Sequence, residues 1–177
     1  MIEGQCVEHS HPPVFRMSVP DAKSQRIVAG VPGSDPEVFL RLTRCLQEPL
    51  FLLYILHTCR GEAELGRYQS PELSFREVEG FVEEFRPFLS ADGRFDLWAY
   101  SPEQRATVAW DRHNLIHAYG PLECYAAELG QLGFDPGDPR IPAPHTHHYR
   151  AELDTFATQL IGRFHWLYSP LRPEDEQ

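Results

Sequence analysis

The sequence predicts an α+β domain in which a mainly antiparallel sheet of about four to six strands packs against about four helices. Three short apolar segments lie between residues 95 and 119, and the connections at 101–105 and 112–114 are short enough for an antiparallel meander. Segments with helical periodicity lie on both sides of this meander. Hydrophobic residues make up 42% of the 177 residues, which suffices for one buried core.

One domain is expected over residues 35–170. Residues 1–34 are rich in proline and glycine and include two β-like stretches, at 14–19 and 26–29, which predict an N-terminal arm or an edge hairpin. Residues 171–177 predict an acidic C-terminal tail.

The first helix is expected to begin with Asp35 as the capping residue and Pro36 in the first turn. Pro49 ends it, and the apolar run Leu50–His57 predicts a strand covered on both faces near the middle of the sheet. Residues 58–73 lack periodicity and are expected to form a long loop, which is either functional or only mobile.

Two later helices have clear terminal signals. Ser74 and Glu77 form a capping-box pattern, with Leu73 and Val78 placed as a hydrophobic staple. Another helix follows Pro121 and is expected to end at a glycine–hydrophobe pair at 133–134. An apolar stripe predicts a last helix over 146–166.

The meander predicts a candidate binding surface. If Trp110 pairs with Leu115 and Trp98 with Val108, one face of the sheet is aromatic with polar tips, a composition that favours binding. The residues predicted for this surface are Trp98, Tyr100, Trp110, His117 and Tyr119, with Asp96 and Val108 on the same face. The alternative is that a second layer of helices covers this face. A shift of one residue in register would exchange the two faces.

Clustered histidines predict a second candidate site. His145, His147 and His148 stand together, and a His-x-His pair with a further imidazole or carboxylate can hold a divalent metal such as zinc. Asp111 and His113, with His117 near them, are the expected additional ligands. The alternative is that these histidines are hydrogen-bonded structural groups or solvated surface residues.

Charge and residue usage exclude several functions. With 16 Lys+Arg against 26 Asp+Glu, the formal net charge of −10 opposes nucleic-acid binding and favours a basic partner. Lys23 is the only lysine and no Gly-Lys pair occurs, so lysine-based catalysis and phosphate-binding loops are disfavoured.

The sequence also leads to expectations about cysteines and location. The four cysteines show no CxxC pair and are expected to be reduced, mostly buried thiols. Neither a signal-peptide pattern nor an apolar run long enough to cross a membrane is evident, so a cytoplasmic protein without membrane contact is expected.

Two classes of function remain. The first is a non-enzymatic acidic domain that binds a protein, of the bacterial immunity or adaptor type, because acidic inhibitors complement basic toxins. The second is a metal-dependent hydrolase that uses the histidines at 145–148. Self-association is compatible with either class.

Overall fold

The computed structural model describes residues 10–21, 24–140 and 149–176. The described residues form one sheet of nine strands in the order β8-β1-β2-β7-β6-β5-β3-β4-β9. Neighbouring strands are antiparallel except for β1 and β8, which are parallel. The strands are β1 (Val14–Asp21), β2 (Ser24–Gly30), β3 (Phe51–Leu56), β4 (Gly66–Gln69), β5 (Phe95–Ser101), β6 (Ala106–Trp110), β7 (Leu115–Tyr119), β8 (Asp135–Pro136) and β9 (Leu167–Ser169).

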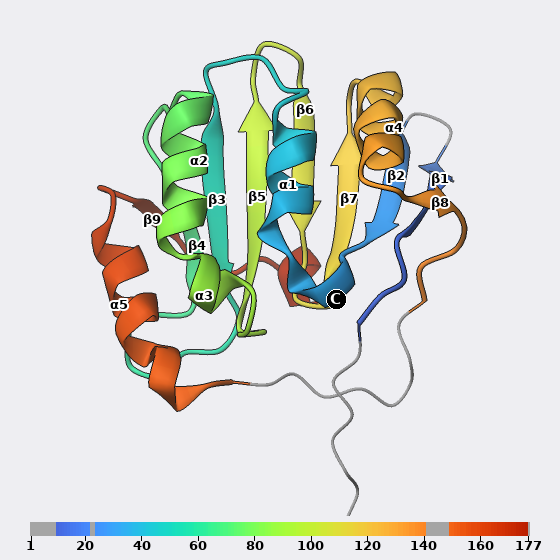
Figure 1. Ribbon diagram of the computed structural model, residues 1–177. Helices are drawn as coiled ribbons and strands as arrows, with labels where there is room; N and C mark the ends of the chain where they lie inside the picture. Colours follow the sequence, from blue (N-terminus) through green and yellow to red (C-terminus); the bar gives the residue numbers. More distant parts are fainter. Residues whose placement is uncertain (1–9, 22–23, 141–148, 177) are drawn as a thin grey trace, which may run out of the picture.

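Five α-helices in the described residues lie on one face of this sheet (Figure 1). They are α1 (Pro36–Thr43), α2 (Phe75–Glu84), α3 (Arg86–Leu89), α4 (Leu122–Gln131) and α5 (Asp154–Gly162). Short 3-10 turns are η1 (Pro32–Ser34), η2 (Ala151–Leu153) and η3 (Pro173–Glu176). The predicted α+β class is confirmed.

The predicted number of strands is wrong, because the sheet has nine strands rather than four to six. The three strands that sequence reasoning missed are β4, β8 and β9, which span four, two and three residues. Such short segments carry too few side chains for an alternating pattern, and their pairing depends on the strand beside them. β4, for example, lies inside the segment 58–73 that was expected to be a loop, where it pairs with β3.

The predicted starts of α1 and α2 and the predicted end of α4 are confirmed, whereas α1 ends at Thr43 rather than at Pro49. The Asp35 carboxylate accepts a hydrogen bond from the amide of Glu37, and Pro36 occupies the first turn of α1. Ser74 and Glu77 form the complete capping box of α2. After α4, Gly133 has a φ of 81°, and the amide of Phe134 donates to the carbonyl of Leu129, as in a Schellman motif.

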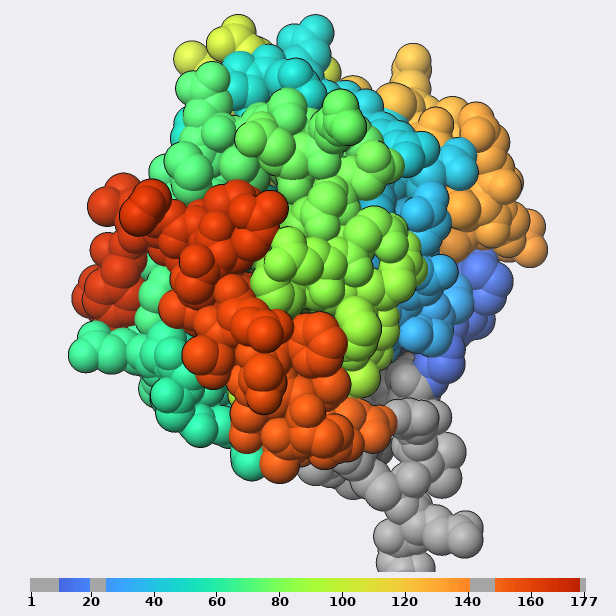
Figure 2. Space-filling view, turned by 60° about the vertical axis from the view of Figure 1, so that its left-hand side comes forward, coloured from blue at the N-terminus to red at the C-terminus, as the bar shows by residue number. Residues whose placement is uncertain are grey.

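The last helix is shorter than the apolar stripe predicted. α5 covers only Asp154–Gly162, and residues 146–148 of the expected helix lie outside the described residues. After α5 the chain is no longer helical but reaches back to α2, where Phe164 and Trp166 pack on Phe81. In Figure 2 this red segment lies against the green helices. Aromatic contacts with another element therefore account for the spacing that sequence reasoning read as helical.

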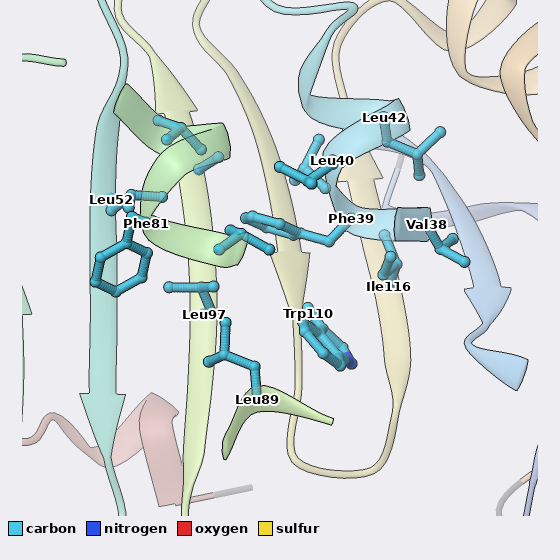
Figure 3. Packing of buried hydrophobic residues seen from close by; sticks show 14 of the residues in the cluster. Val38, Phe39, Leu40, Leu42, Leu52, Phe81, Leu89, Leu97, Trp110 and Ile116 are labelled. Carbon is cyan, nitrogen blue, oxygen red and sulfur yellow. The ribbon is translucent and has the colours of Figure 1, made fainter. Parts of the chain in front are cut away.

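The main core lies between the sheet and the helices (Figure 3). Leu52, Leu97 and Ile116 point from the strands toward Phe39 and Phe81 of the helices, and all five side chains are buried. β3 is the third strand from the β9 edge rather than a central strand. Its second face is covered only in part, because Ile55 is buried there whereas Phe51 and Leu53 are half-buried.

Cys45 and Cys124 form a disulfide that links the end of α1 to α4. The expectation of reduced, mostly buried thiols is therefore wrong for this pair, because folding joins two cysteines that lie 79 positions apart. Cys59 is free and exposed, and Cys6 lies outside the described residues. No helix in the part of the chain that the structure describes is both long and apolar enough to cross a bilayer.

Candidate functional site: the open face of the sheet

The face of the sheet that carries no α-helix, called the open face below, is the first candidate site. Side chains that are paired directly across antiparallel strands point to the same face, so the register identifies its residues. They include Arg26 and Val28 of β2, Phe51, Leu53 and Ile55 of β3, Arg67 and Gln69 of β4, Asp96, Trp98 and Tyr100 of β5, Thr107 and Ala109 of β6, and His117 and Tyr119 of β7.

Four of the five residues predicted for the binding surface share this face. Trp98 lies opposite Ala109, which lies opposite His117, so Trp98 and His117 point the same way. Tyr100 and Tyr119 are connected in the same manner through Thr107. Tyr100 remains 39% exposed, whereas Trp98, His117 and Tyr119 are half-buried. These four residues therefore form one continuous surface over β5, β6 and β7.

The placement of Trp110 and Val108 on this surface is wrong. Trp110 pairs with Ile116 rather than Leu115, and Val108 pairs with Ala99, so both side chains point toward the helices. At the β6–β7 turn, the Asp111 carboxylate accepts the amides of His113 and Leu115, and the amide of Asp111 donates to the carbonyl of Leu115, which adds the pair Asp111–Leu115 to the ladder. The register with β5 differs by one residue as well, because Trp98 pairs with Ala109 rather than with Val108. Trp110 is 2% exposed and packs near Phe39 (Figure 3). This single-residue shift exchanges the faces of β6 alone.

Arginine side chains accompany the aromatic rings on the open face. Arg26 donates a hydrogen bond to the hydroxyl of Tyr119 at 2.7 Å, and its guanidinium lies 5.7 Å from the ring centre. The guanidinium of Arg67 lies 5.7 Å from the ring of Trp98. Tryptophan, tyrosine and arginine dominate the energetic centres of protein interfaces, so this part of the open face has the composition of a binding surface.

Histidine–aspartate contacts lie at one end of the open face. Nε2 of His117 is 3.1 Å from Oδ2 of Asp111, and Nδ1 of His113 is 3.8 Å from the same oxygen. Burial of Asp111 opposes its ionisation, but hydrogen bonds from His113, His117 and the amide of Leu115 outweigh it. The pKa of Asp111 therefore lies well below the usual aspartate range.

A second contact of this kind joins β3 to β5. Nε2 of His57 is 3.1 Å from Oδ2 of Asp96, without hydrogen-bond geometry, and the other oxygen of Asp96 accepts the amide of Arg112. The side chain of His57 is only 5% exposed. Because this imidazole is so little exposed, a substrate cannot reach it, which indicates a structural role.

Only some residues of the predicted metal site belong to the described part of the chain. Asp111 and His113 lie close together, as that prediction requires, but His145, His147 and His148 lie outside the described residues. Within residues 10–21, 24–140 and 149–176, no group of three or more histidine, cysteine, aspartate or glutamate residues is arranged to hold a metal ion. The zinc site that includes the 145–148 histidines stays a prediction.

Sequence reasoning missed the segment that lies on the open face. After β9, which pairs with β4, the chain passes behind the sheet and ends in η3, seen in dark red in Figure 1. Asp175 is buried there, and its carboxylate lies 3.4 Å from Arg67. The only sequence signal at 171–177 was acidic charge, which is typical of a solvated tail and does not indicate a docking position.

A buried ion cluster was also missed. The guanidinium of Arg94 is fully buried and donates to Asp92 at 2.8 Å, to Glu62 at 3.0 Å and to Asp154 at 2.9 Å. Burial, and then the charge of Glu62, raises the pKa of the nearby Tyr54 hydroxyl well above its usual value. Glu62 comes from the segment 58–73, which was expected to be a loop that is either functional or only mobile, and its contact with Arg94 gives this part of the segment a structural role.

Comparison with protein-family models, with curated proteins and with solved structures gives no match.

Proposed function

We propose that this chain is a non-enzymatic protein-binding domain of the immunity or adaptor type, and that its partner binds the open face of the sheet. The observation that carries the proposal is that the described α-helices lie on one face only, whereas the other presents Trp98, Tyr100 and Tyr119 to solvent in part. A sheet face without a helical layer needs another cover for its aromatic rings, and a protein surface supplies one.

The charge of the domain supports a protein partner over a nucleic acid. The net charge of −10 opposes phosphate binding, and a basic partner is favoured overall. A cytoplasmic location belongs to the same proposal, since an immunity protein acts where its toxin acts. The disulfide between Cys45 and Cys124 is the one feature that is more typical of oxidising compartments.

The test is a binding measurement with two sets of variants. Candidate partners are captured from a lysate and purified, and their affinity for the intact chain is measured by calorimetry. Trp98→Ala and Tyr100→Ala should each weaken binding by about tenfold or more while the chain stays folded. Glu83→Gln on α2, which lies on the opposite side, is the matched control and should leave the affinity unchanged. A partner that loses affinity with the α2 variant and not with the sheet variants contradicts the proposal.

A metal-dependent hydrolase is the second candidate, favoured by the contacts of both His113 and His117 with Asp111. If His145, His147 and His148 complete this site, protein purified without a histidine tag should contain stoichiometric metal, and zinc, nickel or manganese should raise its Tm. His113→Ala should lower the metal content. Sub-stoichiometric metal without thermal stabilisation would exclude this candidate as framed.

A further inference from the structure

The C-terminal segment crosses the open face with most of its side chains exposed. Beyond β9, the side chains of Pro170, Arg172, Pro173 and Glu174 are exposed and Leu171 is half-buried. Asp175 is the one residue of the segment 170–175 that is buried. Docking of this segment therefore depends mainly on one carboxylate.

That carboxylate occupies a defined position on the open face. Oδ1 of Asp175 lies 3.4 Å from Nη1 of Arg67, and the two side chains are 1% and 11% exposed. Oδ2 of Asp175 accepts a hydrogen bond from the amide of Arg172, which orients the carboxylate. Because the guanidinium of Arg67 also lies over the ring of Trp98, the contact combines an arginine and an aromatic ring from two different strands.

The fit of this contact is incomplete. Oδ1 of Asp175 is buried and accepts no hydrogen bond from the described residues, although Arg67 lies within ion-pair distance. A buried acceptor that lacks a hydrogen bond is costly, and a carboxylate that meets arginine with good geometry forms a stronger contact. The segment therefore shows that a carboxylate fits the position beside Arg67. A ligand whose carboxylate forms a hydrogen bond with Arg67 can displace the segment.

We propose that residues 170–176 are an intramolecular occupant of the open face, and that the partner displaces them by placing its own acidic side chain on Arg67 beside Trp98. This inference rests on the proposed function, because it assumes that the partner uses the same face. It concerns a single position, so a partner that is basic overall can still supply this one carboxylate. A tethered segment is present at a high effective concentration, which explains why only a well-matched partner would replace it.

The test uses the chain's own segment as the probe. A chain that ends at Ser169 keeps β9, and its binding to a fluorescent peptide covering residues 170–177 is followed by anisotropy. The shortened chain should bind this peptide at least tenfold more tightly than the full chain does, because the position is free. An Asp175→Asn peptide should bind at least tenfold more weakly. A Glu174→Gln peptide is the matched control, since the side chain of Glu174 is exposed, and should bind like the natural peptide.

Two further variants keep the result decisive. In the full chain, Asp175→Asn should release the segment and permit peptide binding, even if the shortened chain does not fold. Arg67→Met in the shortened chain should abolish the difference between the natural and Asp175→Asn peptides. Equal binding of all three peptides, or binding of none to either released chain, would overturn the inference. The proposed function would stand after that result if the affinity for the partner still depends on Trp98 and Tyr100. Conversely, if the peptides bind as expected but the affinity for the partner does not depend on Trp98 and Tyr100, only the proposed function is overturned.

Discussion

Arg94 shows how one buried charge connects distant parts of the chain. Its guanidinium contacts Asp92 beside it, Glu62 from the segment before β4, and Asp154 at the start of α5. The three carboxylates surround a guanidinium that is fully removed from water. Each of them therefore offsets part of the free-energy cost of burying the charge of Arg94. The residues of this cluster thereby hold the 58–65 segment and α5 against the sheet.

Replacing Arg94 should be among the most damaging single changes in the molecule. Arg94→Met leaves the carboxylates of Asp92 and Glu62 buried without their counter-charge, which should lower the free energy of unfolding by about 3–5 kcal/mol. Urea denaturation measures the change. Arg60→Met is the control, because the Arg60–Asp154 pair is half-exposed, and it should leave the stability nearly unchanged. Equal effects of the two substitutions would show that the burial of Arg94 has little importance.

Asp111 should make stability depend on pH in the acid range. Its pKa is lowered in the folded chain, so its ionised form stabilises the fold fully above the unfolded value of about 4 and loses this effect as the pH falls below it. Asp111→Asn should therefore lower the free energy of unfolding at pH 7 by about 1–3 kcal/mol. The difference from the natural chain should narrow below about pH 4. Denaturation curves recorded across this range measure it, and a constant difference would contradict the assignment.

Helices α1 and α4 are joined covalently as well as by packing. Cys45 follows α1 and Cys124 lies in the first turn of α4, and between them the chain forms β3 to β7. The disulfide therefore links two helices that are far apart in the chain, and no local sequence pattern predicts which cysteines pair.

The disulfide leads to a labelling prediction. Iodoacetamide should modify Cys59 in the native chain, whereas Cys45 and Cys124 should react only after reduction, as peptide mass spectrometry would show. Replacing both Cys45 and Cys124 by serine should lower the free energy of unfolding by about 2–4 kcal/mol. Cys59→Ser is the control and should have little effect. Ready labelling of Cys45 in the unreduced native protein would contradict the disulfide.

At the scale of the molecule, the described residues form a sheet that has α-helices on one side only (Figure 1). The two tryptophans of the meander illustrate this asymmetry, because Trp110 points into the helical layer and Trp98 to the open face. Trp110→Ala should lower the free energy of unfolding by about 3–5 kcal/mol. Trp98→Ala should have a clearly smaller effect in the same denaturation experiment. Equal losses would mean that the open face is packed as tightly as the core.

Local chemistry alone was enough to predict the starts of α1 and α2 and the Schellman end of α4. Asp35, Ser74 and Gly133 act on backbone groups within a few positions of themselves, so their effects can be read from neighbouring residues. The meander and four of its surface residues were predicted for a similar reason, since short connections limit how adjacent strands pair.

The geometry of one turn and several long-range contacts decided the remainder. One hydrogen-bonded turn at Asp111 shifted β6 by a residue and moved Trp110 into the core, because strand faces alternate with every position. The short edge strands, the Cys45–Cys124 pair and the contact of Asp175 with Arg67 each join residues far apart in the chain. Whether such residues meet depends on the packed fold as a whole, so the residues next to them in the sequence do not indicate the contact.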